Sequence, residues 1–406
     1  AGRPHPVVQI RGRATWRARN EAYLDPEGEL GVGQQDRRDR THAAGGLFSL
    51  HWIPLVWQSV SATVDLRVDG YQPVDALRDE PLDGTRNRVG LVLSAADDLS
   101  LWEDRLRLSP VLQLHLLDNR LLGDVPYGDT AVAPDARRIY APFTPRLGLR
   151  FRPVEPVAIK ANVGRYFRPP DFTELFGDRG AVVGNSELVP ETGLSWDAGL
   201  RLETPSDPRA FAALETSYFG RRLTDAIVYV QNAQRTQIPV NFGDARIHGV
   251  EAAGQLHLGG VVEINGSLTW MDARNLDPRE AYSGNQLPRV PAWEVWGELV
   301  GRWRDRLRGG VSISHTAGNY WDATNWYLAA PRTLLGLFAR VQPGPRWPYL
   351  EVEIRNLTDR RLQTVPRDPL NPDDGARVVQ PITDFAGYPL PGRTVLVTVG
   401  GVLGKP

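Results

Sequence analysis

The sequence from Leu106 to Leu116 reads LRLSPVLQLHL and alternates between two kinds of residue. Leucine or proline stands at every even position, and the odd positions carry Arg107, Ser109, Val111, Gln113 and His115. A period of two places successive side chains on opposite faces of an extended chain, so the pattern predicts a β-strand with one apolar face. Such a strand is longer than the usual five or six residues of a globular sheet and suits a tilted bilayer crossing of roughly 9 to 11 residues.

The same alternation recurs along the whole chain. It is clear in VEINGSLTW at 262–270 and in LEVEIR at 350–355. Similar stretches begin near Val8, Ala44, Ala62, Asn87, Leu147, Val157, Trp196, Ala212, Ile247, Trp293, Val311, Leu334 and Val395. Together these stretches predict roughly sixteen strands.

The connections between these strands alternate in length. Residues 17–42 and 69–85 are long connections, whereas residues 53–58 and 96–104 are short ones. An antiparallel meander with long loops on one side and short turns on the other is the layout of outer-membrane barrels. We therefore expect an all-β fold, an antiparallel transmembrane β-barrel with long extracellular loops and short periplasmic turns. We expect it to form a single domain over residues 1–406.

The composition narrows the possible functions. The 406 residues include 47 basic and 48 acidic side chains, a balance that argues against a nucleic-acid-binding protein. Cysteine is absent, which excludes disulfides and thiolate metal sites. A soluble propeller or sandwich would also have alternating strands. Strand length, loop alternation and tryptophan pairs near strand ends (Trp52 with Trp57, Trp293 with Trp296) favour a membrane barrel with an aromatic girdle instead.

Three segments resemble the β-barrel of TonB-dependent outer-membrane receptors. The first comprises YFRPPDFTELFG at 166–177 and GNSELVPE at 184–191. The second is NFGDARIHGVE at 241–251, and the third is the pair VEIRNLTDR at 352–360 and GYPLPGRT at 387–394. Their order and spacing span roughly the last 240 residues, which makes the combination far more specific than any one motif. From Val7 to Pro145 the resemblance is only architectural.

The resemblance implies a receptor for active uptake of a scarce nutrient such as a ferric siderophore, haem or cobalamin. Its implied partners are the lipid of a Gram-negative outer membrane, a small-molecule metal chelate or similar ligand, and the TonB-ExbB-ExbD complex. That complex acts on a plug inside the barrel. No plug-like segment is visible in this sequence, and the strand count falls short of the family's barrel of about 22 strands. We expect either the C-terminal part of a longer protein, which we favour, or a reduced barrel.

Two other functions stay open at this point. One is a plugless porin for passive diffusion, and the other is a degenerate barrel that acts as an adhesin or phage receptor. The seven histidines show no metal-binding spacing, and the sequence has no GxSxG, P-loop or dinucleotide motif. We therefore expect no enzyme activity, no catalytic residues, no metal site and no cofactor.

Charges on the polar face of the predicted strands change sign along the chain. The early ones are mostly basic and include Arg105, Arg107 and Arg150, and the later ones are mostly acidic and include Glu263, Glu351 and Glu353. We expect these lumen charges to pair with neighbouring strands or with a plug. The alternative is a transverse field across the lumen that orients a polar solute.

The long loops supply the candidate ligand-binding residues. These are Phe167, Arg168, Asp171, Phe172, Tyr282, Asn319, Tyr320, Trp321, Trp326 and Tyr327. Aromatic rings with a few polar groups suit the capture of an amphipathic chelate from water. Tyr320, Trp321 and Trp326 would equally suit the aromatic belt of the outer leaflet. No motif in the sequence identifies the ligand.

Overall fold

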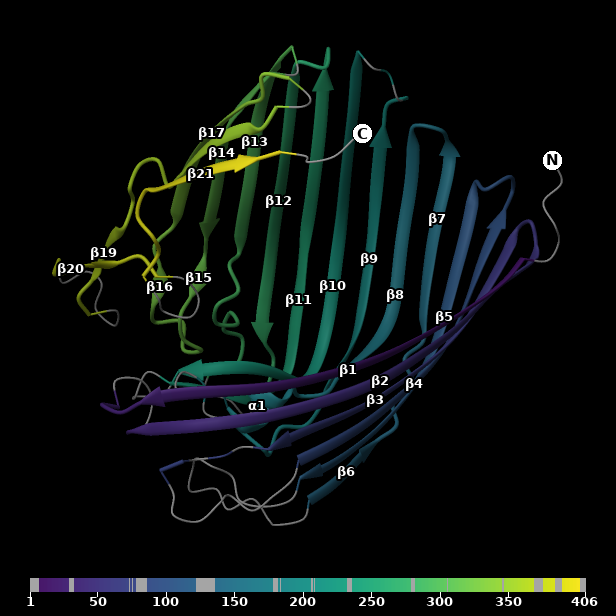
Figure 1. The fold of residues 1–406 in the computed structure, drawn as a ribbon, viewed down its shortest axis with the longest axis vertical. Helices are drawn as coiled ribbons and strands as arrows, with labels where there is room; N and C mark the ends of the chain where they lie inside the picture. Colours follow the sequence, from purple (N-terminus) through teal and green to yellow (C-terminus); the bar gives the residue numbers. More distant parts are fainter. Residues whose placement is uncertain are drawn as a thin grey trace. The chain divides into compact units, whose positions relative to one another are not determined.

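Antiparallel β-strands dominate the computed structural model of this chain (Figure 1). The structure describes residues 7–401 apart from 29–32, 73, 75, 78–85, 122–135, 178–181, 183, 206, 208, 232–235, 279–281, 305, 345–346, 369–374 and 384–388. The chain divides into two compact units, which are described separately. Unit 1 comprises Ala1–Arg152, Ala161–Trp196 and Arg221–Ala245, and unit 2 comprises Pro153–Lys160, Asp197–Gly220 and Arg246–Pro406. A single domain over residues 1–406 stays a prediction.

Sixteen of the strands in the described part of the chain have seven residues or more. They are β1 (Val7–Asp25), β2 (Gln35–Leu55), β3 (Gln58–Gln72), β4 (Arg86–Leu101), β5 (Leu106–Leu121), β7 (Arg146–Val154), β8 (Val157–Arg168), β9 (Glu191–Glu203), β10 (Ala210–Gln231), β11 (Gln237–Leu258), β12 (Val262–Asn275), β13 (Trp293–Trp303), β14 (Leu307–Ala317), β17 (Arg332–Val341), β18 (Tyr349–Arg355) and β21 (Thr394–Gly400). Each of the sixteen predicted stretches falls within one of them. The alternation of apolar residues therefore located every long strand that the structure describes.

The remaining described elements are short. They are the strands β6 (Ala136–Tyr140), β15 (Asn319–Tyr320), β16 (Leu328–Ala329), β19 (Leu362–Pro366) and β20 (Arg377–Pro381), and the helix α1 (Phe172–Phe176). These elements lie in the long connections, where the alternation gives no signal. Within the described residues, no helix is long and apolar enough to cross a membrane.

Unit 1 contains an antiparallel meander of β1 to β5, in which each strand pairs with the next one in sequence (Figure 1). The β1–β2 pairing is continuous from Val7 opposite Ile53 to Asp25 opposite Gln35. Strand β5 pairs with β7 at one end and with the short β6 at the other. The connection between β8 and β9, which contains α1, also belongs to this unit.

Unit 2 contains a second antiparallel meander, in the order β12, β13, β14, β17, β18 and β21. The hairpin β15–β16 lies in the connection between β14 and β17, and the hairpin β19–β20 lies between β18 and β21 (Figure 1). Both hairpins are therefore parts of long connections.

The pairing register separates an apolar from a polar face. In unit 2, Leu268 lies opposite Val295 on the apolar face, and Ser267 lies opposite Trp296 on the polar face. Trp293 lies opposite Trp270, with ring centroids 6.3 Å apart, on the apolar face. Because Trp293 and Trp296 are three positions apart, they point to opposite faces of the sheet. Of this pair, only Trp293 lies on the apolar face, where an aromatic girdle would contact the membrane interface.

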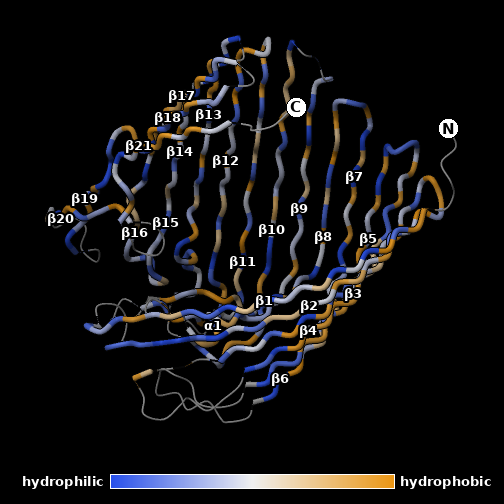
Figure 2. The backbone as a smooth tube through the Cα atoms, in the orientation of Figure 1, coloured by the Kyte–Doolittle hydropathy of each residue, from blue (hydrophilic) through white to orange (hydrophobic). Residues whose placement is uncertain are grey.

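The first long connection is shorter than the sequence predicted. Strand β1 continues to Asp25 and β2 begins at Gln35, so much of residues 17–42 is paired strand. This part reads RARNEAYLD and QDRRDRTH; the β2 end has no apolar face, and the β1 end has only a weak one, made of Ala18, Ala22 and Leu24. Figure 2 shows these ends of β1 and β2 as predominantly hydrophilic. Hydropathy alternation misses such extensions because the apolar face is weak in β1 and missing in β2, although the backbone pairing continues.

Candidate ligand-binding surfaces

The hairpin β15–β16 and its tip, residues 319–329, are organised by the carboxylate of Asp322. This carboxylate accepts hydrogen bonds from three backbone amides, those of Thr324 at 3.1 Å, Trp326 at 3.2 Å and Tyr327 at 2.8 Å. Asn325 adopts a left-handed conformation with φ of 58°, which asparagine tolerates better than most residues. One side chain thus fixes the backbone of the tip.

The connection between β12 and β13 clamps this tip from the side. Gln286 and Asn325 exchange two bonds: the Gln286 amide donates to Asn325 Oδ1 at 2.7 Å, and Asn325 Nδ2 donates to the Gln286 carbonyl at 2.9 Å. Asn285 Nδ2 donates to the Ala323 carbonyl at 3.1 Å. The Arg289 amide donates to the Tyr320 carbonyl at 2.7 Å. The two long connections therefore form one hydrogen-bonded assembly within unit 2.

This assembly presents two large rings to solvent. Trp326 and Tyr327 are each 53% exposed, although their backbone amides are fully engaged. Tyr320 and Trp321 are half-buried beneath them, at the base of the hairpin. An exposed ring on an ordered backbone loses little conformational entropy when it stacks against a ligand. Trp326 and Tyr327 are therefore the two predicted residues best placed to contact a ligand.

The other two candidates in unit 2 lie around this hairpin. Tyr282 belongs to the turn that leads into Asn285, whose amide donates to the Tyr282 carbonyl at 3.0 Å. Asn319 pairs with Ala329, and its buried Oδ1 has no hydrogen-bond partner among the described residues. All six candidates from unit 2 are brought together in two connected loops.

The four candidates in unit 1 have a different environment, because all of them make internal contacts. Arg168 contacts Glu174 at 3.0 Å and Glu191 at 3.6 Å. Asp171 caps α1 by accepting from the Glu174 amide at 2.7 Å, and Glu174 Oε2 accepts in return from the Asp171 amide at 2.8 Å. This reciprocal arrangement is a capping box. Phe167 lies 5.7 Å from His115 between ring centroids.

Phe172 and Phe176 bind the same segment to β3 and β4. Their rings stack on Tyr71 with centroids 5.8 and 5.4 Å away. Arg88 lies over Phe172 at 4.9 Å and donates to the Pro170 carbonyl at 2.7 Å, and Arg86 lies over Phe176 at 4.6 Å. No pattern in the sequence groups Tyr71, Arg86 and Arg88 with this segment, because 82 positions separate Arg88 from its partner Pro170.

Gly177 closes this segment for a steric reason. Its φ is 80°, and a Cβ at this position would lie 2.5 Å from the Val182 carbonyl oxygen. Nearby, the side chain of Asn241 donates to the Val189 carbonyl at 3.0 Å and to the Asp225 carbonyl at 2.7 Å. The segment 241–251 is thus joined to the segment 184–191 by a hydrogen bond from a side chain to the backbone.

The predicted lumen charges are largely paired with near neighbours. Arg107 and Arg150 both contact Asp104 at 2.8 Å, and Glu353 contacts Arg355 at 2.7 Å. Burial raises the pKa of Asp104, but hydrogen bonds from Arg107 and Ser100 and the charges of both arginines outweigh burial and lower that pKa. Glu263 pairs with Arg302 and Arg308. Within the described part of the chain, Arg105 and Glu351 make no ion pair.

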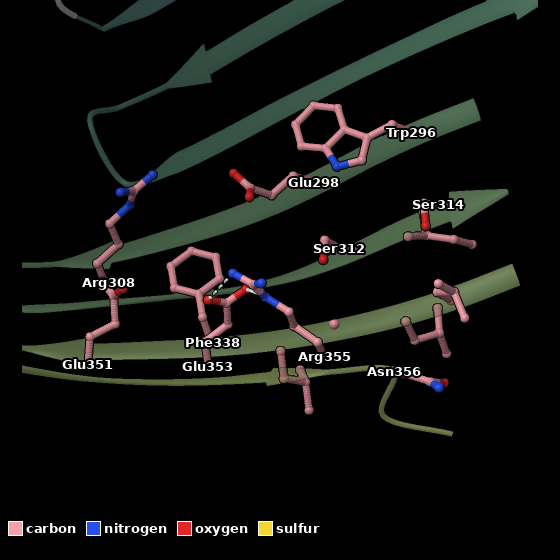
Figure 3. A pocket seen from close by; sticks show the side chains of 15 residues that line it. Trp296, Glu298, Arg308, Ser312, Ser314, Phe338, Glu351, Glu353, Arg355 and Asn356 are labelled. Carbon is pink, nitrogen blue, oxygen red and sulfur yellow. Dashed lines mark hydrogen bonds and ion pairs between the residues drawn. The ribbon is translucent and has the colours of Figure 1, made fainter. Parts of the chain in front are cut away.

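A pocket of about 450 Å³ lies on the polar face of β13, β14, β17 and β18 (Figure 3). Its lining includes Trp296, Glu298, Ser312, Phe338 and Glu353. Figure 3 shows Glu353 bonded to Arg355 beside the Phe338 ring, with Glu298 and Trp296 on β13, beyond the intervening strand β14. The sequence predicted the acidic residues here but not the two aromatic rings among them.

Comparison with known proteins identifies the family. The family described as "TonB dependent receptor-like, beta-barrel" matches residues 8–357. The chain belongs to this family of TonB-dependent receptor barrels. The resemblance and the antiparallel barrel fold predicted from the sequence are both confirmed. In this TonB-dependent receptor barrel, the polar faces of the strands correspond to the lumen.

Individual relatives are distant. The metal-pseudopaline receptor CntO of Pseudomonas aeruginosa is 23% identical over 225 residues, which cover 54% of this chain and 30% of that protein. Among solved structures, the copper transporter OprC has a TM-score of 0.70 at 17% identity, with 97% of this chain and 61% of that chain covered. The ferric yersiniabactin uptake receptor FyuA of Yersinia pestis has a TM-score of 0.68 at 16% identity, with 97% and 58% covered.

The siderophore receptor PiuA of Acinetobacter baumannii has a TM-score of 0.71 at 14% identity, with 97% of this chain and 62% of that chain covered. At these identities the likeness establishes the fold alone. This TonB-dependent receptor barrel spans less than two thirds of each of these relatives.

Proposed function

We propose that this barrel is the membrane-spanning part of an outer-membrane receptor that takes up a metal ion held in a small organic chelate. The observation that carries the proposal is the hydrogen-bonded hairpin that exposes the rings of Trp326 and Tyr327. Two ring faces next to polar groups suit an amphipathic chelate with an apolar scaffold and oxygen or nitrogen donors.

The relatives support this class of ligand. Their names refer to a metal complex of pseudopaline, to copper, to ferric yersiniabactin and to siderophores. All of these names refer to a metal or to a compound that chelates a metal. The specific ligand of this chain is proposed only at that level, and iron is one candidate metal among several. The match to a receptor family agrees with the expectation that the chain is not an enzyme.

In the proposed mechanism, three surfaces of the barrel have different roles. The apolar faces of the strands contact outer-membrane lipid, the hairpin captures the chelate from water, and the polar faces line the passage. Energy would come from the TonB-ExbB-ExbD complex acting through a plug, as the resemblance implies. We propose a Gram-negative outer membrane as the location.

The test measures uptake of labelled metal chelates by cells that produce the full-length protein. Substituting both rings, Trp326→Ala with Tyr327→Ala, is expected to weaken ligand binding by about tenfold per ring, since a lost stacking contact of ~1.4 kcal/mol corresponds to that factor. The matched control is Trp347→Ala, which removes a tryptophan that is 64% exposed in the turn between β17 and β18.

Surface abundance of each variant is measured by immunoblot. Equal uptake by the double variant and the wild type would contradict capture by the hairpin. Uptake that persists after the cells are depleted of TonB would contradict energised transport. A large, steady single-channel current from the full-length protein would point to the passive porin instead.

A further inference from the structure

Three arginines stand in a row on the polar face of unit 2, near the short turns. Arg302 on β13 lies directly opposite Arg308 on β14, and Arg308 lies directly opposite Arg340 on β17. Neighbouring strands are about 4.8 Å apart, and like charges placed directly opposite each other destabilise a sheet. Arg306, in the turn between β13 and β14, adds a fourth guanidinium.

The described surroundings only partly offset this charge. Glu263, whose side chain is 11% exposed, contacts Arg302 and also contacts Arg308 at 3.7 Å. Arg340 stacks on the Tyr349 ring, with its Cζ 3.5 Å from the centroid. The ring stabilises a cation but does not neutralise it. Among the described residues, two carboxylates therefore face the four guanidinium groups: Glu263, and Glu351 of β18, which lies directly opposite Arg340. Asp305 in the same turn lies outside the described residues.

The row encloses a small cavity. Its volume is about 150 Å³, and it is lined by Arg302, Arg306, Leu307, Arg308, Arg340 and Gln342. Such a space holds a phosphate or carboxylate group with a few waters, since one water takes up about 30 Å³. It is too small for a whole siderophore or haem.

Arg308 supplies an independent sign that an acceptor is missing. Its Nε is buried and has no hydrogen-bond partner among the described residues. A buried donor without an acceptor destabilises a protein by about 1 to 3 kcal/mol, so such groups are rare in native structures. The Arg308 side chain as a whole is 41% exposed and lines the cavity, so an oxyanion there would accept from the accessible part of its guanidinium.

We propose that this arginine pocket is a binding site for a phosphate-type oxyanion. Guanidinium groups bind the planar or tetrahedral oxygens of such anions through paired, charge-assisted hydrogen bonds. The anion would also relieve repulsion along the row, so its binding should stabilise the fold. The inference is independent of the metal-chelate proposal, because it concerns a different surface and is tested without any chelate.

The experiment uses the full-length protein, purified in a neutral detergent without added lipid. Inorganic phosphate is titrated by calorimetry at constant ionic strength, and the melting temperature is followed at the same concentrations. Phosphate should bind and raise the melting temperature of the wild type, because a ligand that binds only the folded state stabilises it. Arg308→Gln and Arg340→Gln should each weaken binding by about tenfold or more and remove the thermal shift.

Arg304→Gln is the matched control, because Arg304 lies in the same turn but over its neighbour Trp303, 5.6 Å from the ring centroid, and does not line the pocket. This control should bind phosphate like the wild type. Without phosphate, Arg340→Gln should still unfold cooperatively like the wild type, which separates a lost site from a lost fold. Equal phosphate binding by all variants would overturn the proposal.

A second arm distinguishes free phosphate from a lipid headgroup. The wild type and Arg308→Gln are placed in nanodiscs that contain phosphatidylglycerol, and retained lipid is counted by mass spectrometry. Retention by the wild type alone, reversed by inorganic phosphate, would assign the site to a lipid headgroup. Phosphate binding without selective lipid retention would assign it to a free anion. The absence of both phosphate binding and selective lipid retention would overturn the proposal.

Discussion

Two long connections of this barrel, one in each unit, use aromatic residues in opposite ways. In unit 1, the segment 166–191 buries Phe176 against Tyr71 and pairs Arg168 with two carboxylates. In unit 2, the hairpin 319–329 satisfies its backbone through Asp322 and leaves Trp326 and Tyr327 exposed. The first connection packs an aromatic ring against neighbouring strands, and the second exposes its aromatic rings to solvent.

The difference shows what the family motif marks. The residues of segment 166–191 that resemble the family are those that cap α1, close its turn and contact other strands. None of the three segments that first indicated the family covers the hairpin 319–329, where Trp326 and Tyr327 are exposed. The three segments therefore mark architecture, and the proposed ligand-binding surface lies outside them.

The largest expected effect comes from removing a buried ring in unit 1. Phe176→Ala deletes a side chain that is 4% exposed and lies 5.4 Å from Tyr71, so the free energy of unfolding should fall by about 3 to 5 kcal/mol. Heat or denaturant unfolding of the purified protein measures this loss. Chelate affinity of the folded fraction should stay the same. A lower affinity at unchanged stability would reverse the comparison and make this segment a ligand contact.

A smaller effect is expected at the centre of the hairpin. Asp322→Ala removes the acceptor of three backbone amides without removing either exposed ring. The tip should become more susceptible to proteolysis, and chelate affinity should fall by about 1 kcal/mol, because the rings must then be ordered on binding. Asp359→Ala is a control in another connection of unit 2. Full affinity together with increased cleavage would show that order in the hairpin is irrelevant to capture.

The smallest effect is expected in the turn between β4 and β5, which is one of the short connections. Trp102, Glu103 and Asp104 all have positive φ, and Asp104 bonds to Arg107 and Arg150. The pKa of Asp104 is lowered, so its stabilisation is present above the ordinary pKa of aspartate and is lost as the pH falls through the lowered value.

Asp104→Asn should therefore reduce stability at pH 7 by less than about 1 kcal/mol, as expected for exposed ion pairs. The difference from the wild type should shrink below about pH 4. Melting temperatures of both proteins between pH 3 and 8 provide the measurement. A difference that does not vary with pH would attribute the effect to turn geometry alone.

The sequence predicted the sheet better than the surfaces. Alternation located each long strand because one apolar face repeats every second residue, as in Leu106–Leu116. It missed the polar ends of β1 and β2, whose pairing rests on backbone hydrogen bonds. It could not group Tyr71 with Phe176, because that contact joins distant segments. It placed Trp326 and Tyr327 in a loop correctly, but only the Asp322 hydrogen bonds explain why their backbone is ordered.

The length of the β1–β2 hairpin determines how far this part of the protein extends beyond the membrane. At about 3.4 Å per residue and a tilt near 40°, a 21-residue strand rises roughly 55 Å, more than twice the ~25 Å apolar band of an outer membrane. Its charged end, paired up to Asp25 and Gln35, therefore projects tens of ångströms beyond the lipid. We expect antibodies and other bodies too large to approach the bilayer to encounter this charged end of the receptor.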